Sequence, residues 1–358
     1  MTLGSLFDGI GGWLLAAHHA GVMPLWSSEI EPFPCSVTAR HFPDVHQFGD
    51  ITKIDGAAIP PVDIVCAGSP CQDLSIAGRR EGLDGARSGL FCRAVDIVRA
   101  MRGATDGRFP RFFVWENVPG AFSSNKGADF RAVLQEIGQA EIPMPPNGKW
   151  ANAGVAELPE CEIAWRVLDA QYWGVPQRRR RIFLVADFAA RDRCAGEILF
   201  EREGVSGHLE KSEGARQGTA RGTADCTRIA IYDMTHADEV MRLVKGGITP
   251  TLNARMGTGG NQVPVVHSYC IAGNTIDRKI ENGGTLGGGS ENLAISHSIV
   301  RRLTPTECER LQGLPDDYTA GGSDTARYKA LGNGMAQPCA DYVIRRIVEV
   351  TSNAKSKS

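Results

Sequence analysis

The sequence lacks several features that would each indicate a particular class of protein. It has 10 cysteines, but no two stand in Cys-x-x-Cys spacing, so neither a zinc ribbon nor a redox pair is predicted and we expect no metal site. No apolar run is long enough to span a membrane and no signal peptide is present, so we expect a cytoplasmic protein with reduced thiols and no membrane partner. The net charge is −2, which excludes a basic field over the whole molecule but leaves room for a basic cleft. The 358 residues suffice for one large domain or two modest ones.

The N-terminal stretch contains part of a dinucleotide-binding fingerprint. Residues 2–7 predict a first strand, and Asp8-Gly9-Ile10-Gly11-Gly12 predicts the turn into a helix. The third spaced glycine is missing, because Leu14 occupies its place, so a simple tight turn explains the glycines equally well. Glu29 ends the second predicted strand about twenty residues later, where an acidic residue can hold ribose hydroxyls. The alternative for Glu29 is a solvated carboxylate at a strand end.

A cysteine follows the buried strand predicted at residues 63–67. Open α/β sheets bind ligands at the carboxyl ends of their strands, which is where Cys71 stands. Pro70 fixes its own φ and stiffens the turn from one side. A lone cysteine is usually a small buried hydrophobe, but the polar neighbours Ser69, Gln72 and Asp73 favour exposure here. We therefore predict that Cys71 is a nucleophile, followed by a mobile lid over residues 77–88.

Other polar residues follow predicted strands at the same edge. Asp50 comes after residues 45–48, and Glu116 comes directly after the strand at 111–115. A carboxylate in that position suits a proton donor or acceptor with a raised pKa, although Glu116 could instead cap the following turn. Residues 178–181 are consecutive arginines, typical of a solvated or phosphate-binding patch. Strand alternation would place Arg179 and Arg181 on one face, and Arg178 and Arg180 on the other.

The second half of the chain differs from the first in composition. Residues 141–160 look like a proline-rich insertion with little regular structure, and residues 161–168 and 181–186 predict two strands. From about residue 191 the sequence is polar and glycine-rich, which predicts a small irregular β-rich domain with long loops. A further helix is predicted to begin with Thr304 as N-cap, Pro305 at the first helical position and Glu307 completing the capping box. A closing helix runs to about residue 350.

Together these stretches resemble the motifs of the DNA cytosine-5 methyltransferases, over nearly the whole chain. The resemblance implies an α/β fold: a Rossmann-like S-adenosylmethionine-dependent methyltransferase domain with a mostly parallel sheet, plus a smaller irregular β-rich target-recognition domain. It implies a catalytic domain at 1–190, a recognition domain at 191–299 and a returning segment at 300–358. The matching segments are Phe7-Asp8-Gly9-Ile10-Gly11-Gly12 (cofactor), Pro70-Cys71-Gln72 (nucleophile), Glu116-Asn117-Val118 (acid), Gln177-Arg178-Arg179-Arg180-Arg181 (arginine motif), residues 301–315 and Gly332-Asn333-Gly334.

The resemblance also implies residue roles. Cys71 would add to C6 of a flipped cytosine in duplex DNA, Glu116 would bind N3 and the exocyclic amine, and Arg181 with Arg179 beside it would hold O2 and the neighbouring phosphate. S-adenosylmethionine would be the cofactor. Its expected contacts are Phe7, Asp8, Gly9, Gly11, Gly12, Glu29, Ile30, Asp50, Ile51, Pro70, Leu90, Asn333 and Gly334, and the expected DNA contacts are Ser75, Arg79, Gln177 and Arg255.

Two details of the resemblance carry further expectations. Gly334 stands where the family usually has serine, which removes a hydroxyl near the cofactor carboxylate and predicts modestly weaker cofactor binding. Thr251-Leu252 resembles a short signature of the recognition domains, and the nearby Arg255 has the fork that matches guanine O6 and N7. Contact of Arg255 with a phosphate, or with solvent only, is the alternative.

Three other functions compete with DNA methylation. A cytosine-5 methyltransferase acting on structured RNA shares the motifs, but the long glycine- and threonine-rich segment favours reading of a duplex groove. A nicotinamide-binding oxidoreductase would give no role to Cys71, Glu116 or the arginines. A DNA-binding module that has lost catalysis is disfavoured, because every expected catalytic position is still occupied by the expected residue. We expect a monomer, of a bacterial or phage type, with a cognate restriction endonuclease as a candidate partner.

Overall fold

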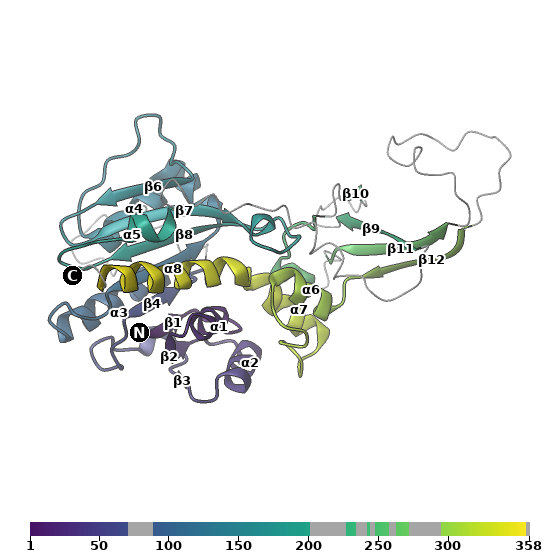
Figure 1. Ribbon diagram of the computed structural model, residues 1–358, viewed down its shortest axis with the longest axis horizontal. Coiled ribbons are helices and arrows are strands. Elements are labelled where there is room, and N and C mark those ends of the chain that lie inside the picture. The colour runs from purple at the N-terminus through teal and green to yellow at the C-terminus, as the bar shows by residue number, and fades with distance from the viewer. Residues whose placement is uncertain are drawn as a thin grey trace.

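The computed structural model describes residues 1–70, 89–200, 227–233, 242–243, 248–257, 263–271 and 295–355. Figure 1 shows a large lobe built on one sheet, which holds both chain termini, and a smaller group of strands that extends from one end of it. Within the described part of the chain, no helix is both long and apolar enough to cross a membrane.

The large lobe is organised around an eight-stranded sheet of order β3-β2-β1-β4-β5-β8-β7-β6. The first five strands in that order are parallel, whereas β8 runs antiparallel to both β5 and β7. The mostly parallel α/β fold is therefore confirmed. The strands are β1 (Thr2–Leu6), β2 (Met23–Ser28), β3 (His46–Gln47), β4 (Ile64–Ala67), β5 (Phe112–Asn117), β6 (Ala153–Glu157), β7 (Glu162–Asp169) and β8 (Arg180–Asp187).

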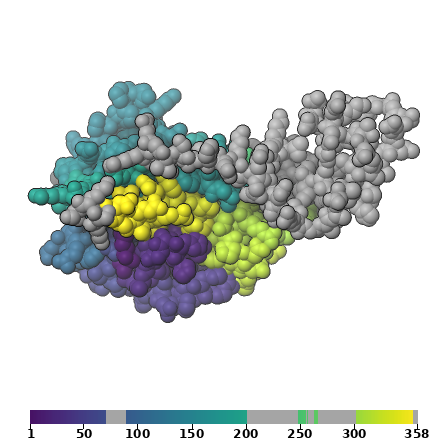
Figure 2. All heavy atoms as spheres, in the orientation of Figure 1, coloured from purple at the N-terminus to yellow at the C-terminus, as the bar shows by residue number. Residues whose placement is uncertain are grey.

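Helices cover both faces of this sheet, because its central strands are apolar on both sides. In β5, Phe112 and Val114 pack with α1, α5 and α8, while Phe113 and Trp115 pack with α3 and α4. The space-filling view shows α8, in yellow, lying between the N-terminal elements and the teal segment (Figure 2). The helices are α1 (Gly12–His19), α2 (Pro32–His41), α3 (Leu90–Ala104), α4 (Ala128–Gly138), α5 (Ala195–Leu199), α6 (Pro305–Gln312), α7 (Asp324–Asn333) and α8 (Gln337–Lys355).

Two elements of the large lobe differ from the sequence-based expectation. Strand β6 lies inside the stretch 141–160 that was expected to have little regular structure. It is the edge strand, and its side chains alternate only between exposed and half-buried, so it has no apolar pattern to reveal it. Helix α4 is not among the predicted elements, although Phe130, Val133 and Ile137 are buried at helical spacing.

The second sheet has four antiparallel strands in the order β10-β9-β11-β12. These are β9 (Thr227–Asp233), β10 (Arg242–Leu243), β11 (Val265–Ile271) and β12 (Ile295–Arg302). The expected boundary at residue 190 falls ahead of α5, whose Ala195, Ile198 and Leu199 belong to the core shared with α1 and α8. Likewise Leu252 and Met256 pack in a third core with residues of α6 and α7. The large lobe therefore incorporates pieces of chain on both sides of β9.

Candidate active site

A buried ion pair lies where β5 and β8 meet at the carboxyl edge of the parallel strands. Arg181 Nε is 3.0 Å from Oε1 of Glu116, and the two side chains are only 16% and 13% exposed. Burial raises the pKa of the Glu116 carboxyl, and the charges of Arg181 and Arg179 oppose that rise without cancelling it. The edge thus presents a carboxyl group that holds its proton more tightly than a solvated glutamate does.

The segment that leads to Cys71 is tied to the strand that carries Glu116. Ser69 accepts a hydrogen bond at Oγ from Trp115 Nε1 (3.0 Å) and another at its carbonyl from Asn117 Nδ2 (3.0 Å). A Cβ placed on Gly68 would lie 3.6 Å from Glu116 Oε2, so the chain passes beside the acid on its way to the cysteine. Cys71, Ser75 and Arg79 lie outside the described residues. The anchoring roles of Ser69 and Asn117 were not predicted, because neither residue alone signals a contact so far along the chain.

The glycine turn after β1 borders open space beside an exposed apolar side chain. Phe7 and Gly9 have φ of 56° and 58°, and a Cβ placed on Gly9 would meet nothing within 4 Å. The Gly9 N–H donates to Glu29 Oε2 (2.8 Å), while Oε1 accepts from the N–H groups of Ile30 and Glu31. Ile30 is 69% exposed. Glu29 therefore stands at the turn as predicted, and it also fixes the backbone there.

Asp8 lies behind this turn and not on its open side. Its side chain is 4% exposed, and Thr38 donates to Oδ2 at 3.3 Å. The other oxygen has no hydrogen-bond partner among the described residues. Burial, together with the nearby charge of Glu29, raises the pKa of Asp8 to about 7, although the neighbouring hydroxyl groups of Ser5 and Thr38 lower it. Asp8 supports the turn from inside the fold.

The remaining predicted cofactor residues divide by exposure. Asp50 accepts from the N–H and hydroxyl of Thr52, which lowers the pKa of Asp50 and caps the 3₁₀ turn η1 (Ile51–Lys53). The side chain of Ile51 is 5% exposed and packed in the core with α3, so a cofactor contact at Ile51 stays a prediction for its backbone alone. Of the others, Pro70 and Asn333 are exposed, Gly12, Leu90 and Gly334 are half-buried, and Gly11 is buried with a φ of 84°.

Arg179 joins three separate segments instead of facing a substrate. It is 1% exposed and donates to the carbonyls of Leu252 (2.7 Å), Gly332 (3.0 Å) and Gly334. Burial lowers the pKa of its guanidinium well below the usual value. Its NH1 and NH2 groups are used in these bonds, and its Nε is buried without a partner among the described residues, so we assign Arg179 a positioning role. No sequence signal distinguishes it from its arginine neighbours.

Gln177 is also buried, which corrects its assignment as a DNA contact. Its side chain is 0% exposed, and both amide atoms lack a partner among the described residues. The backbone around it pairs with the segment that follows β10: Thr249 N–H donates to Pro176 O (2.8 Å), and Arg178 N–H donates to Thr249 O (2.9 Å). This backbone pairing and the bonds of Arg179 form what we call the joint between residues 176–179 and 249–252.

The helical turn η9 (Ala254–Gly257) continues from the joint and packs on α7. A Cβ placed on Gly332 would lie 2.1 Å from the carbonyl carbon of Asn253, so only glycine permits this backbone contact. Arg255 lies on η9, and its side chain is outside the described residues. Helix α7 therefore carries the exposed Asn333 at its end and also packs against the segment that contains Arg255.

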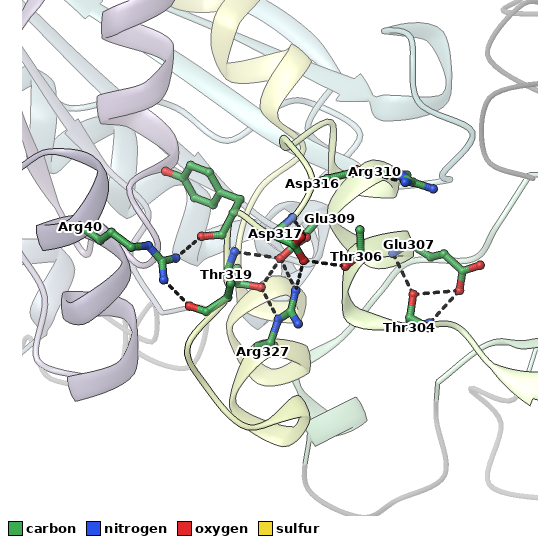
Figure 3. Close-up of polar contacts among 12 residues, drawn as sticks. Arg40, Thr304, Thr306, Glu307, Glu309, Arg310, Asp316, Asp317, Thr319 and Arg327 are labelled. Carbon is green, nitrogen blue, oxygen red and sulfur yellow. Dashed lines mark hydrogen bonds and ion pairs between the residues drawn. The ribbon is translucent and has the colours of Figure 1, made fainter. Parts of the chain in front are cut away.

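The stretch after β12 is held by a buried carboxylate (Figure 3). Glu309 is 0% exposed and accepts from Arg327 NH2 (2.9 Å) and from the N–H groups of Asp317 and Thr319 (2.8 Å each). The capping box of Thr304 with Glu307 is present as predicted. Arg40 of α2 donates to the carbonyl of Tyr318 (2.5 Å). These contacts fix the returning segment against the elements of the N-terminal turn.

Comparison with known proteins shows which family the chain belongs to. Residues 1–349 match the model of the C-5 cytosine-specific DNA methylases. The chain is 30% identical to a protein of Escherichia phage P1 named DNA N-6-adenine-methyltransferase, covering 100% of this chain but 62% of that protein. It is 28% identical to the Type II methyltransferase M.HpaII of Haemophilus parainfluenzae, covering 98% of this chain and 90% of the relative. The structure of the S. pombe Dnmt2 methyltransferase is similar, with a TM-score of 0.58 at 17% identity over 98% of each chain.

Proposed function

Because the chain belongs to the family of C-5 cytosine-specific DNA methylases, we propose that it methylates C5 of a cytosine within a specific sequence of duplex DNA. The observation that carries this proposal is the pairing of Glu116 with Arg181, 3.0 Å apart, beside the anchored stem of the Cys71 segment. A carboxyl group whose pKa is raised by burial, next to a fixed cation, suits the edge of a pyrimidine that must accept negative charge.

The reaction requires a nucleophile because C5 of cytosine is unreactive while the ring is aromatic. The thiolate of Cys71 forms a bond to C6, which places an electron pair at C5. Glu116 donates its proton toward N3, and Arg181 offers its remaining N–H groups to O2, so both stabilise the charge of the adduct. After methyl transfer a base removes the C5 proton, the C6–S bond breaks and the thiolate leaves.

The residues of the glycine turn fit S-adenosylmethionine as the cofactor. When bound, it supplies an electrophilic methyl group. The open side of Gly9 and the exposed side chain of Ile30 leave room for a planar base, and Phe7 is half-buried at the same turn. The Glu29 carboxylate stands at the end of β2, where ribose hydroxyls are bound in open α/β sheets. Asn333 is exposed at the end of α7 and would contact the methionine end.

The target cytosine must leave the duplex to reach Cys71. Flipping costs a few kcal/mol, which contacts with phosphates and the vacated space must offset. We propose that residues 75–89, which include Ser75 and Arg79, supply part of those contacts.

We also propose that the protein is a monomer that protects the DNA of its own cell or phage, with a cognate endonuclease as partner, since relatives carry Type II names.

The name of the phage P1 relative raises a second candidate reaction, methylation of adenine N6. An exocyclic amine carries its own electron pair and needs no covalent adduct, so that reaction gives Cys71 no role.

The test is to incubate the protein with methyl-labelled S-adenosylmethionine and random-sequence duplex DNA, or RNA, and to identify the methylated nucleoside by mass spectrometry. We expect 5-methylcytosine from DNA alone. N6-methyladenine, or label in RNA alone, would reject the proposal.

A further inference from the structure

A polar cavity lies beside the candidate active site, at the end of β7 and the start of β8. Its volume is about 590 Å³, and Arg178 and Arg180 line it together with Arg166, Asp169, Tyr172 and Asn152. Arg178 and Arg180 are exposed, and neither guanidinium forms a hydrogen bond or ion pair with the described residues. Tyr172 is 60% exposed. The cavity therefore holds two cationic groups that have no partner in the described part of the chain, and an accessible hydroxyl.

The single carboxylate of this lining is already occupied. Asp169 accepts from Gln171 Nε2 (2.7 Å) through one oxygen and from the Arg179 N–H (3.1 Å) through the other. The groups left to meet a ligand are guanidinium forks, a phenol and an amide, which can all donate hydrogen bonds. Such a set favours an anion with several oxygens, and the paired N–H groups of arginine match phosphate in particular.

The cavity lies at the same edge of the sheet as the catalytic residues. Strand β7 runs parallel to β5, so its end at Asp169 and the start of β8 at Arg180 share the carboxyl edge with Glu116. Two steps between neighbouring strands span about 10 Å. That distance corresponds to about three nucleotides along one DNA strand. A duplex whose cytosine enters at Glu116 therefore has backbone phosphates within reach of the cavity.

We propose that this cavity binds phosphates of the DNA backbone flanking the target cytosine, through Arg178, Arg180 and the hydroxyl of Tyr172. The inference rests on the proposed function, because it concerns the same duplex. Contacts to phosphates carry no sequence information but release counterions, so they set the affinity and its dependence on salt. The cavity would thus anchor the duplex beside the active site without affecting the choice of target.

The experiment compares Arg178→Gln, Arg180→Gln and the double variant with the wild type on two duplexes that contain the target sequence. One duplex ends two base pairs beyond the target on each side, and the other extends ten base pairs further. On the long duplex, the slope of log K against log salt should fall by about 0.9 for each lost phosphate contact. At 0.1 M salt this corresponds to about an eightfold loss of affinity for each contact, relative to 1 M salt. On the short duplex, the variants should bind like the wild type.

Arg108→Gln is the matched control, because Arg108 is exposed and precedes β5 at the opposite edge of the sheet. It removes the same charge and should leave the salt slope unchanged. Unchanged slopes in the double variant would overturn the inference, as would equal losses on both duplexes, which would place the arginines at the flipped base. A loss of the same size in Arg108→Gln would attribute the effect to net charge alone. Methylation by the wild type is measured in the same samples, so failure of the proposed function is recognised separately.

Discussion

Glu116 and Asp8 are two carboxyl groups at the same edge of the sheet, and both have a pKa raised by burial. They differ in the charge of their neighbours. Glu116 has Arg181 beside it, so its charge is partly compensated while its pKa still rises. Asp8 has no cation among its described contacts, and Glu29 adds a second negative charge nearby. The first arrangement suits the proposed reaction, which needs both a proton and a cation. The second makes the cofactor turn sensitive to pH through the stability of the fold.

The free energy of unfolding should therefore depend on Asp8. Its folded pKa of about 7 exceeds the usual 3.8, so the folded protein retains a proton that the unfolded chain releases from about pH 4 upward. Stability is lost as pH rises through that window, by an amount on the order of 4 kcal/mol for this group. In Asp8→Asn the loss should disappear. Urea denaturation of both proteins at pH 5 and pH 8 measures it, and equal pH dependence would contradict the argument.

Cys71→Ser should abolish methyl transfer while leaving DNA binding largely intact, because a serine hydroxyl is a far weaker nucleophile than a thiolate. DNA with 5-fluorocytosine at the target should become covalently attached to the wild type, since elimination then has no proton to remove. Cys35→Ser is the control, as Cys35 is the one described free cysteine that is not buried. Near-normal turnover of the Cys71 variant, measured by transfer of label, would refute the nucleophile assignment.

Glu29→Ala should raise the dissociation constant for S-adenosylmethionine by roughly tenfold or more, because charge-assisted hydrogen bonds to the ribose are lost. The substitution also frees the N–H groups of Gly9, Ile30 and Glu31. Calorimetric titration measures the affinity, and a thermal melt of the free protein separates the two effects. An unchanged affinity would leave Glu29 with its role in the turn alone.

At the scale of elements, α7 serves two partners at once. Its last turn carries Asn333, a proposed cofactor contact, and Gly332 one residue earlier receives the backbone of η9. The carbonyl groups of Gly332 and of Gly334, which directly follows the helix, also accept hydrogen bonds from Arg179. A disturbance of this helix end should therefore reach both the cofactor site and the segment that carries Arg255.

Two substitutions separate these contacts. Gly332→Ala should destabilise the protein by about 1–3 kcal/mol, because the new Cβ would lie 2.1 Å from backbone that cannot move aside freely. Gly334→Ser should leave stability unchanged, since its φ is −63° and its nearest neighbour would be 3.4 Å away. The serine should also bind S-adenosylmethionine modestly more tightly than wild type. Denaturation and calorimetry give both values, and equal stability losses would contradict this reading of the helix end.

The sequence predicts the elements whose signal is local. The buried strand runs and the capping box at Thr304 are recognised because their patterns depend on a few adjacent residues. The positions of Glu116 and Glu29 at the carboxyl edge are predictable because each stands at the end of such a strand, whereas their functional roles stay predictions. Strand β6 escapes because it buries no side chain fully. Arg179 and Gln177 are misassigned because their burial is produced by Thr249 and Leu252, about seventy residues away, and no local pattern encodes that contact.

At the scale of the whole molecule, target reading should depend on Arg255. The residue lies on η9, which the joint and α7 hold against the large lobe. If Arg255 reads a guanine, Arg255→Ala should cost about 1–3 kcal/mol on the cognate site and relax the choice at one base pair. A phosphate contact would instead weaken all sequences equally and flatten the salt dependence. Methylation profiling on a random-sequence library decides, and an unchanged preference at every position would refute base reading.

The joint has a consequence for how such a protein diversifies. Arg179 and the chain around Pro176 hold the incoming segment mainly through its carbonyl and N–H groups, which every residue type provides. Side chains beyond the attachment can then change without loosening it. Related chains that share the large lobe can thus vary the side chains of β9 to β12 while α5 and the joint stay in place, which under the proposed function would change the target and keep the chemistry.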